Sequence, residues 1–241
     1  MFKILIAGGP CEHFIAKCID SVLSQTVQNF EVLISLDPYD NAPQITKRFE
    51  SERVKVWTNP KPRGSLYNVY CATCMSKMED DDILVFMDAD DWLLHDRALE
   101  CVDRIYKVYP NTLITHGGWT TGNKAYDKTE TLLPYTEKDF EDIRNARWKA
   151  TQLKTMKWVV YKNISLDEFK DETGQWFFRG GDHALMFPAL EMAGYDRVKC
   201  VTEKIYFYNR FDRSVTPEGK ICPEKDVAYI CSKKPYQRLE I

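Results

Sequence analysis

The sequence lacks a long hydrophobic segment and an excess of charge of either sign. No apolar run reaches the roughly 18 residues that a membrane-spanning helix needs. The apolar start, MFKILIAGG, is too short for a secretory signal and is typical of a first strand. The 33 Lys and Arg residues nearly balance the 36 Asp and Glu residues, for a net charge of −3. We therefore expect a soluble, cytoplasmic protein without a transmembrane segment. Peripheral membrane association stays open, and nucleic acid is not an expected partner.

The eight cysteines form no zinc-binding pattern. Cys71 and Cys74 make a single C-x-x-C pair, and Cys222 and Cys231 are spaced wrongly to complete a zinc ribbon. Most cysteines lie within periodic apolar segments, as expected of free thiols in a reducing compartment. We interpret Cys71 and Cys74 as small apolar residues on one face of a helix.

Strands and helices are predicted to alternate along the first hundred or so residues. Short apolar or alternating runs predict strands at 3–7, 31–36, 53–57 and 82–87. The segments between and after them predict helices at 12–25, 42–51, 66–78 and 96–109. Such alternation predicts an α/β domain with a mostly parallel central sheet and helices on both faces.

The second half of the chain is less regular. Residues 183–193 predict a helix that contains Pro188, and residues 203–208 predict one more strand. From Phe211 the sequence turns polar and contains proline and glycine. We therefore expect residues 1–210 to form the domain and residues 211–241 to form a C-terminal tail, which is either a lid or a surface strap.

Candidate functional residues follow the predicted strands. Ligands of open parallel sheets bind beyond the carboxyl ends of the strands, where this chain has Asp37, Arg63 and the acidic run Asp88-Ala89-Asp90-Asp91. Two carboxylates separated by one residue at a strand end can converge on one divalent cation, and Mg²⁺ and Mn²⁺ prefer such oxygen ligands. The alternative for the acidic run is a helix cap before Trp92.

Four segments occur in the order found in family 2 glycosyltransferases, and the chain resembles that family over roughly residues 1–216. They are residues 20–34, which contain DSVLSQT and NFEVLI, residues 83–92 (ILVFMDADDW), residues 180–182 (GGD) and residues 206–216 (YFYNRFDRSVT). The resemblance implies a GT-A (Rossmann-like) fold and a nucleotide-diphosphate sugar donor, with a UDP-sugar expected. It also implies a Mn²⁺ or Mg²⁺ cofactor and inversion at the anomeric carbon. The acceptor could be a glycan, a lipid, a protein or a small molecule.

The resemblance also implies roles for individual residues. Asp37 and Arg63 fall where relatives bind the base and phosphates of the donor, and Asp88 falls near the ribose and the metal. Asp90 is the expected principal metal ligand, and Asp182 is the expected general base. Simpler alternatives are turn chemistry for Asp37, a solvated loop charge for Arg63 and a helix cap for Asp182.

Four further residues are candidates for the acceptor site. His116 ends the strand-like run LITHGG, close in order to where relatives line the acceptor cleft, and a structural role is its alternative. Trp119 and Trp176 could stack on a sugar ring or pack in the core. His183 is a candidate acceptor contact, and either His183 or His116 is the next candidate base if Asp182 is only a helix cap.

Two rival functions remain. A sugar-phosphate nucleotidyltransferase would normally have a charged glycine-rich loop after the first strand, and residues 8–10 (GGP) lack the charge. A non-catalytic nucleotide-sugar-binding module is disfavoured by the intact Asp88, Asp90 and Asp182. The basic stretch at 144–157 is interpreted as a solvated helix face, with binding of an anionic acceptor as the alternative.

Overall fold

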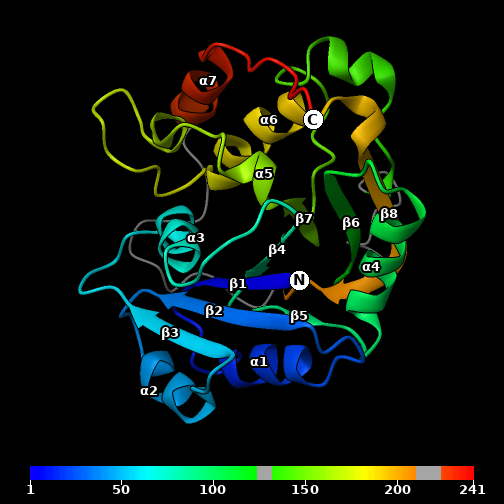
Figure 1. Cartoon of the computed structure of the whole chain (residues 1–241). Helices are drawn as coiled ribbons and strands as arrows, with labels where there is room; N and C mark the ends of the chain where they lie inside the picture. Colours follow the sequence, from blue (N-terminus) through cyan, green and yellow to red (C-terminus); the bar gives the residue numbers. More distant parts are fainter. Residues whose placement is uncertain (124–131, 210–223) are drawn as a thin grey trace.

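The computed structural model describes residues 1–123, 132–209 and 224–241. Its centre is one eight-stranded sheet with the strand order β3-β2-β1-β4-β7-β6-β8-β5 (Figure 1). The strands are β1 (Phe2–Gly8), β2 (Phe30–Leu36), β3 (Val54–Thr58), β4 (Ile83–Asp88), β5 (Trp92–Leu93), β6 (Ile114–Thr120), β7 (Lys154–Lys157) and β8 (Val198–Phe207). The helices are α1 (Ile15–Leu23), α2 (Ala42–Thr46), α3 (Ser65–Thr73), α4 (Ala98–Val108), α5 (Trp158–Tyr161), α6 (Gly181–Ala193) and α7 (Glu224–Ser232). Short 3₁₀ helices lie at Lys47–Phe49, Glu137–Glu141, Leu166–Phe169 and Tyr195–Arg197.

The sheet has a parallel half and a mixed half. β1 pairs in parallel with β2 and β4, and β2 pairs in parallel with β3. β7 then lies antiparallel between β4 and β6, β6 is parallel to β8, and β5 is antiparallel to β8. The register places Gly8 beside Leu36 and Ala7 beside Asp88, so the carboxyl ends of β1, β2 and β4 lie together. This arrangement confirms the predicted α/β class with its mostly parallel sheet.

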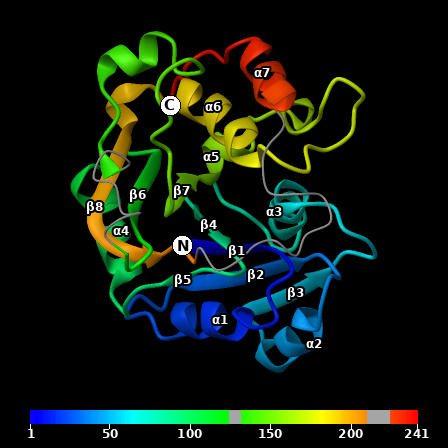
Figure 2. The same cartoon turned by 180° about the vertical axis from the view of Figure 1, so that it is seen from behind.

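Helices cover both faces of the sheet, as predicted. Ile4 and Ile6 of β1 belong to one buried cluster with residues of α1 and α4, whereas Leu5 and Ala7 belong to the other cluster with residues of α3 and α6. This division follows from the alternation of side chains along a strand. The two opposite views show α1 and α2 on one side of the sheet, and α3, α5 and α6 on the other (Figures 1 and 2).

The prediction of a helix face for the basic stretch at 144–157 is wrong. Residues 142–153 form turns, bends and irregular chain, and the stretch then continues as β7. Its cations meet separate acids: Arg144 pairs with Glu191, Lys149 with Asp139, Lys154 with Asp182 and Lys157 with Asp81. Because these four cations pair with four different acids, they do not form a single basic surface.

The last 18 residues, 224–241, pack against the body of the domain. The backbone N–H of Leu239 donates to the carbonyl of Met192 on α6 at 2.9 Å, and the guanidinium of Arg197 donates to the carbonyl of Leu239 at 2.9 Å. The expected boundary between domain and tail falls within 210–223, outside the described residues. In the part of the chain that is described, no helix combines the length and the apolar character needed to cross a membrane.

Candidate active site

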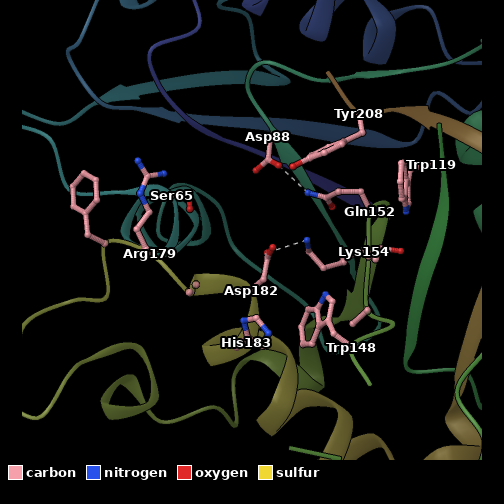
Figure 3. Close-up of a pocket in the computed structure, with 15 residues that line it drawn as sticks. Ser65, Asp88, Trp119, Trp148, Gln152, Lys154, Arg179, Asp182, His183 and Tyr208 are labelled. Carbon is pink, nitrogen blue, oxygen red and sulfur yellow. Dashed lines mark hydrogen bonds and ion pairs between the residues drawn. The ribbon is translucent and has the colours of Figure 1, made fainter. Parts of the chain in front are cut away.

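A pocket of about 410 Å³ lies beyond the carboxyl end of β4, beside the first turn of α6 (Figure 3). This volume falls within the range of small-molecule sites in proteins. Charged, amide and aromatic side chains from several elements line it, including Asp88, Trp119, Trp148, Gln152, Lys154, Arg179, Asp182, His183 and Tyr208. The predicted residues Asp88, Asp182, Trp119 and His183 are therefore brought together.

The acidic run after β4 divides into two kinds of carboxylate. Asp91 is fully buried, accepting a hydrogen bond from the Tyr206 hydroxyl at 2.7 Å and another from the Asn209 N–H at 2.8 Å. Burial, assisted by Asp91 and Asp88, raises the pKa of Tyr206 well above its usual range, so the hydroxyl stays protonated and can donate. Asp91 therefore ties the acidic turn to the end of β8, whereas Asp88 and Asp90 are half-buried.

The chemistry of Asp88 and Asp90 fits a hard divalent cation. Asp88 ends the buried strand β4, and one of its oxygens accepts a hydrogen bond from the Gln152 amide at 3.0 Å. Asp90, the expected principal metal ligand, follows two residues later and does not line the pocket. No group of three or more potential His, Cys, Asp or Glu ligands occurs within 1–123, 132–209 and 224–241. A cation held here would need further oxygens, and Mg²⁺ commonly takes them from substrate phosphates and water. The part of the C-terminal motif from residue 210 onward, including Phe211, lies outside the described residues.

Asp182 lies in the first turn of α6, where the helix dipole favours a negative charge. The helix begins at Gly181 with Gly180 as its N-cap, so Asp182 is not the capping residue. Its side chain is 60% exposed, and one oxygen lies 2.9 Å from the ammonium of Lys154, whose side chain is only 3% exposed. A Cβ on Gly181 would lie 3.0 Å from the Cβ of Leu66, so this position needs a very small residue for α6 to approach α3.

Lys154 and Gln152 were not predicted as site residues. They come from β7 and the segment just before it, and each contacts one of the predicted carboxylates, Asp182 and Asp88. The segment QLKTMK has no apolar run that would predict a strand. Only the long-range pairing that sets Lys154 opposite Phe86 of β4 brings it to the pocket.

Asp37 and Arg63 lie next to each other but do not line this pocket. Asp37 is buried, and its carboxylate accepts hydrogen bonds from the backbone N–H groups of Arg63 at 3.0 Å and Gly64 at 2.9 Å. It also accepts one from the Asn59 amide at 3.1 Å. The guanidinium of Arg63 lies 4.3 Å from the centre of the Tyr67 ring. Asp37 therefore holds the loop after β3, and binding of the donor by either residue stays a prediction.

The four acceptor candidates occupy two kinds of position. Trp119 and His183 line the pocket, whereas His116 is fully buried and Trp176 packs against Tyr67, with ring centres 4.9 Å apart. Burial lowers the pKa of His183, and the nearby Asp182 opposes this shift. The acceptor roles stay predictions, and the first two residues are placed to reach a ligand in the pocket.

A break in strand register places Trp119 differently from His116. The pairing of β6 with β8 shifts between Gly117 and Trp119. Gly117 and Gly118 have φ values of +94° and +84°, and an added Cβ on Gly118 would lie 2.7 Å from the carbonyl oxygen of Glu203. Only glycine tolerates both conditions. Such irregularities commonly redirect side chains next to active sites.

The family model for glycosyl transferase family 2 matches residues 10–163, more than half of the chain, and the chain belongs to this family. No curated protein matches the sequence. Among solved structures, S. aureus TarS (residues 1–349) is similar with a TM-score of 0.64 and 15% identity, over 86% of this chain and 60% of that chain. TarS in complex with UDP-GlcNAc matches with a TM-score of 0.61 and 13% identity, over 97% of this chain and 61% of that one.

A third similar structure is the mannosyltransferase PcManGT from Pyrobaculum calidifontis in complex with GDP-Man and Mn²⁺. Its TM-score is 0.59 at 14% identity, and the match covers 88% of this chain and 57% of that chain. The chain thus spans about 60% of the length of these solved proteins. The likeness confirms the predicted GT-A fold.

Proposed function

We propose that the chain is an inverting, metal-dependent glycosyltransferase that moves one sugar from a nucleotide-diphosphate donor to an acceptor hydroxyl. The observation that carries the proposal is that Asp88, after β4, and Asp182, in the first turn of α6, line the same pocket (Figure 3). Family membership supports glycosyl transfer over the rival nucleotidyltransferase reaction. The relatives bind UDP, UDP-GlcNAc and GDP-Man, so we expect a UDP-sugar donor, with a GDP-sugar as the alternative to test.

In the proposed reaction, Asp182 accepts the proton of the acceptor hydroxyl as the acceptor oxygen attacks the anomeric carbon. A new C–O bond forms on one face of the sugar, and the bond to the diphosphate breaks on the other, so the configuration inverts. Lys154 holds the Asp182 carboxylate by an ion pair, and α6 fixes the backbone of the base. Asp88 and Asp90 would hold the Mn²⁺ or Mg²⁺ ion, which neutralises charge on the departing diphosphate when bound.

The proposal assigns Asp37 and Arg63 to the nucleotide side of the site. The hydrogen bonds from Arg63 and Gly64 to Asp37 fix the loop after β3, which precedes the pocket residue Ser65. In this role Asp37 shapes the loop, and Arg63 supplies the positive charge. Trp119 and His183 contact the acceptor, which could be a glycan, a lipid, a protein or a small molecule on the family resemblance alone.

The test combines donor binding with a base variant. Thermal stabilisation by UDP-GlcNAc and GDP-mannose, with and without Mn²⁺, measures donor binding, since a ligand at 100 times its Kd adds about 2.7 kcal/mol. Release of the nucleotide diphosphate with water as acceptor measures turnover. Asp182→Asn keeps the shape and removes the basicity, and a positioned base supplies about 10²–10⁴-fold. We therefore expect turnover to fall at least ~10²-fold with unchanged donor affinity.

Asp167→Asn is the matched control, because that side chain is 86% exposed and lies outside the pocket. Loss of donor affinity in Asp182→Asn would place the residue in the donor or metal site instead. Unchanged turnover would remove it as the base and make His183 the next candidate. A wild-type protein that binds donor but never releases the nucleotide diphosphate would support the non-catalytic binding module.

A further inference from the structure

The aromatic side chain of Trp148 lines the pocket near Asp182 and packs against other rings. The Trp148 ring is half-buried and lines the pocket, with its centre 4.3 Å from the His183 ring and 5.5 Å from the Phe187 ring. His183 and Phe187 are four residues apart on α6, so they share one face of that helix. The Trp148 ring therefore packs against the same helix that carries Asp182.

Other aromatic rings line the same pocket. Trp119 and Tyr208 both contribute to the lining, and their rings meet edge to face with centres 5.8 Å apart. Figure 3 shows Trp148 beside Lys154 and His183, and Trp119 below Tyr208 on the same side of the pocket as Gln152. A ligand that reaches Asp182 therefore occupies a pocket that presents aromatic surfaces as well as the ion pair formed by Asp182 and Lys154.

We propose that Trp148 is the stacking surface of an acceptor subsite, and that the acceptor is a carbohydrate ring. This inference rests on the proposed glycosyl transfer at Asp182. A pyranose presents C–H bonds on one face, which suit the negative face of an indole, and hydroxyls at its rim, which suit a carboxylate. Trp148 and Asp182 offer these two surfaces next to each other, in a pocket of a volume that suits small rings.

The charges of the pocket favour a sugar over a phosphate-bearing lipid. Asp88 and Asp182 both line it, and the Lys154 cation already pairs with Asp182 at 2.9 Å. Arg179 is the other cation in the lining, so the acids and the cations balance. Recognition of a phosphate group normally uses a cluster of positive charge, and a neutral saccharide needs none.

The test measures how acceptors accelerate nucleotide release from UDP-GlcNAc and GDP-mannose in Mn²⁺. The probes are methyl glycosides of glucose, galactose, mannose and N-acetylglucosamine, the disaccharides maltose and cellobiose, dodecyl phosphate, and a serine-rich peptide. We expect at least one saccharide to accelerate release and to have a saturable KM. In Trp148→Leu, which keeps bulk and removes the ring, this KM rises at least ~10-fold, equivalent to about 1.4 kcal/mol. In Trp148→Phe, which keeps an aromatic face, it returns to within a few fold of wild type.

Trp158→Leu is the matched control, because Trp158 is also half-buried and stacks on Tyr161, but does not line the pocket. Its saccharide KM is expected to match wild type. Thermal stabilisation by the donor shows whether each variant keeps its fold and its donor site. The inference is overturned if no saccharide accelerates release, if only dodecyl phosphate or the peptide does, or if Trp148→Leu and Trp148→Phe behave alike. Failure of both donors to bind wild type would instead refute the proposed function itself.

Discussion

His116 gives the protein a stability that depends on pH in a defined direction. The side chain is fully buried on β6, with its ring 5.2 Å from the Tyr135 ring, and neither nitrogen makes a hydrogen bond of good geometry with the described residues. Burial lowers the pKa of His116 from 6.5 to about 4, while the nearby Lys149 backbone acts in the opposite direction with smaller effect. The imidazole is therefore neutral in the folded protein at neutral pH.

The magnitude of the effect follows from these two pKa values. Below pH 6.5 the unfolded chain binds a proton at His116 that the folded chain does not bind until the pH approaches 4. The contribution of the neutral His116 to the free energy of unfolding is thus fully present above pH 6.5 and is lost as the pH falls toward 4. A pH of 5.0 lies about 1.5 units below the pKa of His116 in the unfolded chain. Each unit of this difference lowers the free energy of unfolding by about 1.36 kcal/mol. We expect His116 to make the protein about 2 kcal/mol less stable at pH 5.0 than at pH 7.5.

Urea denaturation of wild type and His116→Gln at both pH values tests this expectation. The quantity compared is the loss of unfolding free energy between pH 7.5 and pH 5.0, so the packing effect of glutamine and the other titrating groups cancel. Wild type should lose about 2 kcal/mol more than the variant. His13→Gln, at a side chain that is 80% exposed, serves as the control. Equal losses in wild type and His116→Gln would refute the reasoning, because they would show that folding does not change the pKa of His116.

A pair of variants in the acidic run separates metal-dependent binding from stability, and a third variant tests a buried ion pair. Asp90→Asn should abolish the Mn²⁺-dependent thermal stabilisation by UDP-GlcNAc or GDP-mannose. Asp91→Asn should instead lower the free energy of unfolding in urea by about 2 kcal/mol, because the buried Asp91 carboxylate accepts a hydrogen bond from Tyr206. The reverse pattern would exchange these roles. Arg144→Ala should lower the free energy of unfolding by about 3–5 kcal/mol, because it leaves the Glu191 carboxylate buried without its cation. The side chains of Arg144 and Glu191 are both less than a tenth exposed. A loss below about 1 kcal/mol in its thermal or urea unfolding would show that water takes over the pairing.

The parallel half of the sheet could be predicted because each of its units is local in sequence. An apolar strand, a turn and a helix with periodic apolar residues follow one another, and strand boundaries agree within about two residues, as for β1 at Phe2–Gly8 against the predicted 3–7. Of the mixed half, the sequence predicted only the strand at 203–208, which overlaps the end of β8, and the strand-like run at 113–118, which overlaps β6. β7 reads KTMK and β5 is only Trp92–Leu93, and both are strands because neighbouring strands offer them hydrogen bonds.

The same contrast between local sequence signals and long-range contacts explains which site residues could be predicted. Asp88 and Asp182 were predicted because each belongs to a contiguous motif at the end of an element. Lys154 and Trp148 were missed as site residues because their roles depend on pairing with β4 and packing against α6. The shared helix face expected for the basic residues failed for the same reason, since the fold distributes those cations among acids from distant segments.

β7 connects the two halves of the proposed chemistry. Gln152, just before the strand, donates to Asp88 on the metal side, and Lys154, two residues later, pairs with Asp182 on the base side. Both side chains line the pocket, so one short segment reaches both carboxylates. Because β7 also pairs with β4, which ends at Asp88, the position of the proposed base relative to the proposed metal ligands depends on sheet register as well as on helix α6, which carries Asp182. A site built on strand register is held more precisely than one built on loops, as in-line transfer between a leaving diphosphate and an incoming hydroxyl requires.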